Sequence, residues 1–136
     1  MREYEFRGKR KDNGEWVYGF VVVTKMSGVY ILGTYMNSTH SKRGGVSVGD
    51  KLWQHEVDPA TVGQYIGRKD KNNKKVWEGD VVRCRDSYDF LTFQGKVSFD
   101  NASFYIETDI GGHYRWMDYE VEVIGNIWDN PLEVTP

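Results

Sequence analysis

Histidine and cysteine are the side chains in this sequence best suited to hold a metal, and their spacing argues against such a site. His40, His55 and His113 are dispersed, and none lies at ligand spacing from another histidine or from Cys84. A protein metal site needs three or four converging ligands of suitable type. We therefore interpret the histidines as surface residues and expect no metal.

Cys84 is the only cysteine, which rules out an intramolecular disulfide. It lies in the alternating stretch 81–85, where it shares the expected inner face of a strand with Val82. Such a cysteine behaves as a small apolar core residue, whereas a reactive thiolate needs exposure and a nearby positive charge. We expect a buried structural thiol rather than a nucleophile.

Paired carboxylates are the remaining candidates for catalysis. They occur at Asp86 with Asp89, and again at Asp118, Glu120 and Glu122. Glycoside-type catalysis needs two carboxylates that face each other across a cleft, with the pKa of one of them raised. Glu120 and Glu122 instead alternate with valines, which is typical of a solvated strand face. We expect no catalytic residue here.

Glycine pairs occur at 44–45 and 111–112, but neither precedes a helix whose N-terminus could bind a phosphate group. We interpret both as turns. With no site for a cofactor and no catalytic constellation, the sequence predicts a protein that is not an enzyme. A small hydrolase would need a cleft for which the sequence has no signal.

Basic residues lie near aromatic ones in the first half of the chain. Nucleic-acid binders combine cations for phosphate contacts with rings for base stacking, often on small β-barrels. The candidate residues are Arg7, Lys9, Arg10, Trp16, Lys42, Arg43, Lys71, Lys74 and Lys75. Against this hypothesis, the sequence pI near 5.9 is far from that of a basic domain. The alternative is that tryptophan and tyrosine form the core, while lysines keep turn tips and edge strands soluble.

Charge is distributed unevenly along the chain. Residues 1–75 carry fourteen Lys or Arg and eight Asp or Glu, giving +6, whereas residues 76–136 carry four and twelve, giving −8. The two values add to the net charge of −2. This asymmetry indicates an anion-binding face, head-to-tail association, or two halves that neutralise each other in space.

The 136 residues suffice for one domain with a sizeable core. Aromatic residues reach 15%, which is not typical of disorder. Short apolar runs separated by Gly, Asn and Asp predict strands and turns. In the first half the predicted strands span 4–9, 16–23, 29–32, 52–57, 63–68 and 76–77.

Two other features stand out in that half. Residues 37–51 are polar and rich in glycine, which predicts a loop. Asp58 followed by Pro59 is an N-cap signal, which predicts a single helical turn.

The second half is more regular and is opened by the segment Trp77-Glu78-Gly79-Asp80. Five strands joined by tight turns suit a small barrel of the Src-homology-3 type. They are predicted at 80–85, 92–99, 103–108, 114–116 and 120–127. We expect one all-β domain over 1–136, with a basic subdomain 1–75 and an acidic, barrel-like subdomain 76–136.

The N-terminus has no apolar signal-peptide core, and no apolar run is long enough to span a membrane. We therefore expect a cytoplasmic protein without a membrane partner.

Four stretches of the chain together resemble the YopX family of bacterial phages and prophages. They lie at 6–19, 57–65, 69–82 and 123–131 and include Lys69-Asp70-Lys71-Asn72, Trp77-Glu78-Gly79-Asp80 and Gly125-Asn126-Ile127-Trp128. The resemblance implies a mostly β fold, a phage or mobile-element origin and no established biochemical role. It brings no catalytic residues. Where this chain has Asn72-Asn73 the family often has Asn-Gly, which leaves the type of this turn open.

From these observations we expect a non-enzymatic structural or interaction protein that self-associates as a homo-oligomer. The motivation is a helix-poor chain with many strand edges and oppositely charged halves. The alternative is a small β-barrel protein that binds nucleic acid through its basic N-terminal half.

Overall fold

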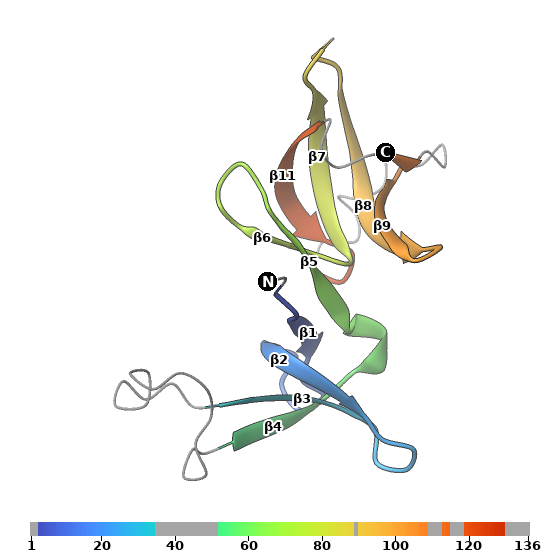
Figure 1. The fold of residues 1–136 in the computed structure, drawn as a ribbon. Helices are drawn as coiled ribbons and strands as arrows, with labels where there is room; N and C mark the ends of the chain where they lie inside the picture. The colour runs from blue at the N-terminus through green and yellow to red at the C-terminus, as the bar shows by residue number, and fades with distance from the viewer. Residues whose placement is uncertain (1–2, 35–51, 89, 109–112, 115–118, 130–136) are drawn as a thin grey trace. The chain divides into compact units, whose positions relative to one another are not determined.

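The computed structural model describes residues 3–34, 52–88, 90–108, 113–114 and 119–129 (Figure 1). The chain forms two compact units, one of residues 4–62 and one of residues 1–3 with 63–136. Strands dominate the described residues, so the predicted all-β class is confirmed. The predicted loop 37–51 lies outside the described residues. The change of charge at 75/76 falls within a strand, whereas the compact units divide before Gly63.

The N-terminal unit is built on four antiparallel strands in the order β4-β3-β2-β1. Their bounds are β1 Phe6–Lys9, β2 Trp16–Val23, β3 Val29–Thr34 and β4 Leu52–Val57. These bounds match the predicted runs closely because turn residues separate the runs. The 3₁₀ turn η1 (Pro59–Thr61) follows, and the side chain of Asp58 accepts a hydrogen bond from the Ala60 N–H at 3.0 Å, as the N-cap signal predicts.

This sheet curls so that the end of β1 meets the end of β4. Arg10 forms an antiparallel bridge with Val57, and the Asp58 N–H donates to the Lys9 carbonyl at 2.9 Å. Ile31 and Val57 lie on the inner face and are fully buried. The core of the unit is therefore on the concave side of its sheet.

The C-terminal unit begins with an antiparallel hairpin of β5 (Gly63–Lys69) and β6 (Lys75–Trp77). An antiparallel sheet follows, with strand order β10-β9-β8-β7-β11. Its strands are β7 Asp80–Asp86, β8 Thr92–Asp100, β9 Ser103–Glu107, β10 His113–Tyr114 and β11 Tyr119–Asn126. All five were predicted. The closure of these strands into a barrel stays a prediction.

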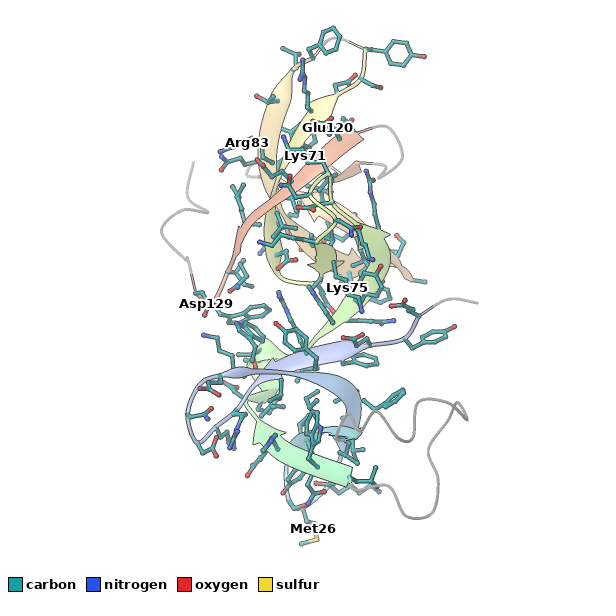
Figure 2. All side chains as sticks on the ribbon, turned by 90° about the vertical axis from the view of Figure 1, so that its left-hand side faces the viewer. Met26, Lys71, Lys75, Arg83, Glu120 and Asp129 are labelled. Carbon is teal, nitrogen blue, oxygen red and sulfur yellow. The ribbon has the colours of Figure 1, made fainter. Side chains whose placement is uncertain are left out.

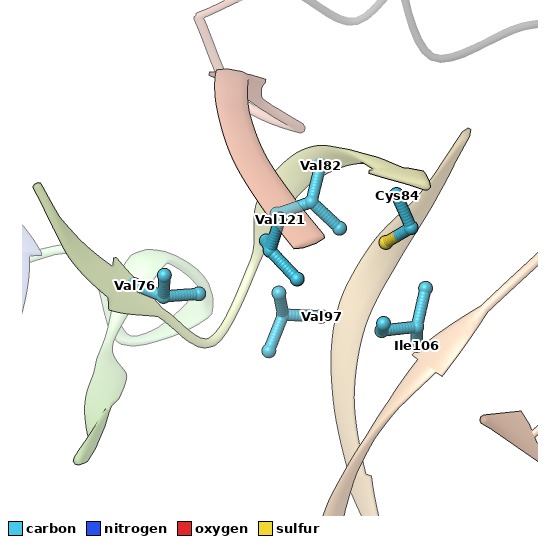
Figure 3. Close-up of a cluster of buried hydrophobic side chains, with 6 residues drawn as sticks. All are labelled: Val76, Val82, Cys84, Val97, Ile106 and Val121. Carbon is cyan, nitrogen blue, oxygen red and sulfur yellow. The ribbon is translucent and has the colours of Figure 1, made fainter. Parts of the chain in front are cut away.

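One cluster of buried side chains forms the core of the C-terminal unit (Figure 3). It comprises Val76, Val82, Cys84, Val97, Ile106 and Val121. The residues come from the β5–β6 hairpin and from four strands of the sheet. Since most of them are small and β-branched, they pack well on a pleated surface.

The segment that joins β6 to β7 is fixed by its own residues. The Trp77 N–H donates to Oδ2 of the buried Asp80 at 2.8 Å. Gly79 has a φ of +91°, and a Cβ at this position would lie 2.1 Å from the ring of Trp128. Only glycine satisfies both constraints, which explains how Trp77-Glu78-Gly79-Asp80 and the later Trp128 belong to one structural feature.

Asp70 holds the tip of the β5–β6 hairpin and connects it to β11. One carboxylate oxygen accepts hydrogen bonds from the N–H groups of Asn72 (2.9 Å) and Lys74 (2.8 Å). The other oxygen accepts from the Val123 N–H at 2.9 Å. Asn73 has a φ of +66°, the left-handed conformation for which glycine is favoured. The family's Asn-Gly fits this turn directly.

Burial alone would raise the pKa of Asp70, but the hydrogen bonds from Val123, Lys74 and Asn72 favour the carboxylate and lower the pKa. A carboxyl group whose pKa is lower in the folded state stabilises the fold above its unfolded pKa of about 3.9. That contribution disappears as the pH falls through the folded pKa. We therefore expect the free energy of unfolding to decrease below about pH 4.

Asp70→Asn should lower the free energy of unfolding at pH 7 by about 2 kcal/mol, because an amide cannot accept all three hydrogen bonds as a carboxylate does. Its stability should also change less than that of the wild type when the pH falls through the acid range. Urea unfolding at a series of pH values measures both effects. Asp100→Asn, at an exposed position in the β8–β9 turn, is the control and should keep most of the wild-type stability at pH 7. Equal behaviour of the two variants would contradict the role of Asp70.

The β8–β9 turn predicts a stabilising substitution. Asn101 and Ala102 both have positive φ, at +50° and +62°, and Asp100 pairs with Ser103 around them. This is the two-residue primed hairpin turn, for which Asn-Gly is the favoured pair. Ala102→Gly should raise the free energy of unfolding by about 1 kcal/mol, since alanine is disfavoured at positive φ. Urea unfolding measures this, and Ala60→Gly, outside the positive-φ region, should instead lose stability.

Candidate interaction surfaces

Three of the residues proposed for nucleic-acid binding come together on one sheet face of the N-terminal unit. The guanidinium of Arg7 lies 4.5 Å from the centre of the Trp16 ring, and the ammonium of Lys9 lies 5.4 Å from it. The β1–β2 register places Lys9 directly opposite Trp16. Arg7 is only 5% exposed, so its guanidinium packs within the protein. The cluster is a cation–π arrangement that stabilises the sheet.

Arg10 does not join this cluster. Its guanidinium forms two hydrogen bonds with the carboxylate of Asp12, at 2.8 and 2.6 Å. The pair raises the pKa of Arg10 and lowers the pKa of Asp12, because each favours the charged form of the other. The positive charge of Arg10 is therefore balanced within its own turn.

The cations of the β5–β6 hairpin lie among carboxylates (Figure 2). The Lys71 ammonium is 3.9 Å from Glu120 and 3.7 Å from Glu122, both on β11. The Lys75 ammonium is 3.3 Å from Glu3. Lys74 is exposed, and Lys42 and Arg43 lie outside the described residues. The Trp16 cluster belongs to the N-terminal unit, whereas the hairpin lysines belong to the C-terminal unit.

The charge difference between the two halves of the sequence is larger than the charge difference between the two compact units. Residues 4–62 carry eight basic and six acidic residues (+2), and the remainder carry ten and fourteen (−4). The difference between the two compact units is therefore much smaller than that between the two halves of the sequence. The reason is that the basic hairpin belongs to the same unit as the acidic strands.

Two residues considered for chemistry, Cys84 and His55, pack against other side chains of the protein. Cys84 is buried in the core, as predicted. His55 lies beside Trp53, with ring centres 5.2 Å apart. Among the described residues, no group of three or more His, Cys, Asp or Glu is placed to hold a metal ion. In the same part of the chain, no helix has the length and apolar character needed to cross a membrane.

An exposed apolar surface on the outer side of the N-terminal sheet was not predicted from the sequence. It is formed by Tyr18 (45% exposed), Phe20 (65%), Val22 (41%) and Leu52 (64%), which we call the apolar face. Alternation along β2 places the first three on one side of the strand. Alternation does not say which side is covered, and here the inner side carries the smaller Val17, Gly19 and Val21.

The fold places the chain in the class of small all-β proteins, here with two compact units. The model of the YopX protein family matches residues 5–133, so the chain belongs to the YopX family.

A similar fold occurs in the crystal structure of protein EF1440 from Enterococcus faecalis. The likeness covers 98% of this chain and 99% of that chain, with 19% sequence identity and a TM-score of 0.53. At this identity the likeness supports the fold alone. The search of curated proteins found no match.

The thiol of Cys84 should be inert in the folded protein. Burial raises its pKa to about 12, and the nearby positive charge of Arg68 offsets this only in part. At pH 8 we expect no reaction with a thiol reagent such as dithionitrobenzoate until urea unfolds the protein. The absorbance of the released thiolate measures this, and rapid reaction of one thiol in the native state would contradict it.

Proposed function

We propose that this protein is a non-enzymatic interaction module that self-associates through the apolar face. The observation that carries the proposal is the exposure of four large apolar side chains on one face of the β2-β3-β4 sheet. Contiguous exposed apolar surface of this kind marks interaction sites in proteins. Because apolar burial is non-directional and favourable, a second copy of the same face is a suitable cover.

The register supports treating the four residues as one surface. Phe20 pairs with Leu32, and Leu32 pairs in turn with Gln54, which is two residues from Leu52 on β4. Alternation along β4 puts Leu52 and Gln54 on the same side of the sheet. The apolar face therefore runs across three adjacent strands. Two such sheets can stack face to face, with the side chains of both filling a space about 10 Å thick.

Charge gives less support to self-association than the sequence indicated. Exposed ion pairs contribute about 0–1 kcal/mol each, and those of Lys71 with Glu120 and Glu122 lie within one unit. Assembly by opposite halves would need these charges to face another copy. The proposed association is accordingly apolar, and it should persist or strengthen as salt is added.

A non-enzymatic role is supported by what the described candidate carboxylates do, whereas Asp89 and Asp118 lie outside the described residues. Glu122 is 3.4 Å from Arg83 as well as close to Lys71, and Asp86 holds a turn through its hydrogen bond to the Tyr88 N–H. These carboxylates stabilise charges and turns of the protein itself. The nucleic-acid alternative stays a prediction. Its cations in the described residues are largely paired with carboxylates or stacked on Trp16.

Phe20→Thr should shift the protein from dimer to monomer, because it removes the most exposed ring of the apolar face and keeps a residue favoured in strands. Light scattering after gel filtration, over a dilution series up to about 100 μM, measures the mass. The dissociation constant should rise at least about tenfold, the effect of losing about 1.4 kcal/mol.

Val23→Thr is the matched control, since Val23 is also exposed on β2 but points to the opposite side from Phe20. It should leave the mass unchanged. A wild-type protein that is monomeric over the whole series, or a dimer that is equally insensitive to both substitutions, would exclude the apolar face as the site of self-association.

A further inference from the structure

The tip of the β7–β8 hairpin in the C-terminal unit carries a second group of exposed apolar side chains. Tyr88 is 94% exposed, Phe90 62% and Leu91 67%. The two strands extend beyond the other strands of their unit, so that the tip projects from it (Figure 1). None of the three belongs to the buried cluster that forms the core.

Hydrogen bonds join the described residues on the two sides of this tip. The Asp86 N–H donates to the Leu91 carbonyl at 2.9 Å, and the Phe90 N–H donates to the Asp86 carbonyl at 3.1 Å. The Tyr88 N–H donates to Oδ1 of Asp86 at 2.7 Å. Described residues whose backbone groups are held in this way lose little entropy when their side chains bind, which favours affinity.

Phe90 has a φ of +59°, a left-handed conformation that is disfavoured for an L-residue. Asparagine or glycine would relieve this cost in an exposed turn, and a large aromatic residue is an outlier there. The guanidinium of Arg85 lies 4.8 Å from the centre of the Phe90 ring and supports its position. An exposed ring held in a strained conformation is typical of a residue retained for contact with another molecule.

Charge at the tip favours a protein partner over a membrane. Residues 85–91 carry Arg85 against Asp86 and Asp89, a net charge of −1, and the C-terminal unit as a whole carries −4. Anionic lipid head groups would repel this charge, whereas basic residues around a pocket would complement it. Aromatic side chains that enter an apolar pocket are the usual anchors of protein interfaces.

We propose that Tyr88, Phe90 and Leu91 form a docking knob that enters an apolar pocket with a basic rim on a partner protein. The knob lies in a different unit from the apolar face, so self-association leaves this proposal unaffected. The partner contact should weaken with salt, unlike the apolar self-association.

Photo-crosslinking identifies the partner. The protein carries p-benzoylphenylalanine in place of Tyr88 in its native host cells, and in a parallel sample in place of Met26, which is 98% exposed in the N-terminal unit. We expect one discrete adduct from position 88 that position 26 does not form. Mass spectrometry then names the crosslinked protein, and capture alone does not count as support.

Calorimetry with that purified protein tests the site. The double variant Tyr88→Ser, Phe90→Asn should bind at least about tenfold more weakly than the wild type, a loss of about 1.4 kcal/mol. Asparagine tolerates the left-handed conformation, so urea unfolding should show a stability at least equal to that of the wild type. Phe20→Thr should bind like the wild type. The dissociation constant should rise between about 50 and about 300 mM salt, as expected for screened charges.

Four outcomes would overturn the proposal. They are the absence of an adduct specific to position 88, an adduct that is only this chain itself, and equal affinity of the double variant and the wild type. The fourth is flotation with phosphatidylglycerol vesicles that the double variant abolishes, which would assign the knob to a lipid surface.

Discussion

The buried carboxylate of Asp70 is the contact on which the C-terminal unit depends. It satisfies two backbone N–H groups inside the β5–β6 hairpin and a third on β11, so one side chain both shapes a turn and places it. The Lys71 N–H adds a 2.9 Å bond to the Val121 carbonyl beside it. These bonds bring Val76 over the sheet, where it completes the buried cluster. A desolvated charge is costly unless it is fully hydrogen-bonded, and here the backbone supplies the bonds.

The same connection changes how charge is distributed in the folded C-terminal unit. The basic hairpin is drawn onto the acidic β11, and Lys71 meets Glu122 there. Because Lys71 pairs with Glu120 and Glu122, about fifty residues further along the sequence, opposite charges from the two halves of the sequence neutralise each other within one unit. Surface apolarity, in contrast, is not balanced in this way. Both the apolar face and the docking knob consist of large side chains that the described core does not use.

Strands and turns were predictable because local chemistry determines them. Asn13-Gly14 and Ser27-Gly28 bound the run 16–23, and β2 has these bounds in the structure. Burial of Cys84 followed from alternation in β7. The direction of the β2 side chains was not predictable, since it depends on where the chain curls and which face its own strands cover. The pairing of Lys71 with β11 and the approach of Trp128 to Gly79 depend on long-range contacts that no local pattern contains.

The position of β11 has a consequence for how the chain reaches its structure. In the sheet, β11 pairs with β7 and reaches back over an interval that includes β8, β9 and β10. Until β11 is in place, one edge of β7 lacks its neighbour, the core lacks Val121, and Asp70 lacks its third donor. Contacts between such distant segments are formed late and slow the folding of β proteins. During synthesis, the strands made before β11 therefore have an unpaired edge. In this state a β protein is most prone to pair with another chain.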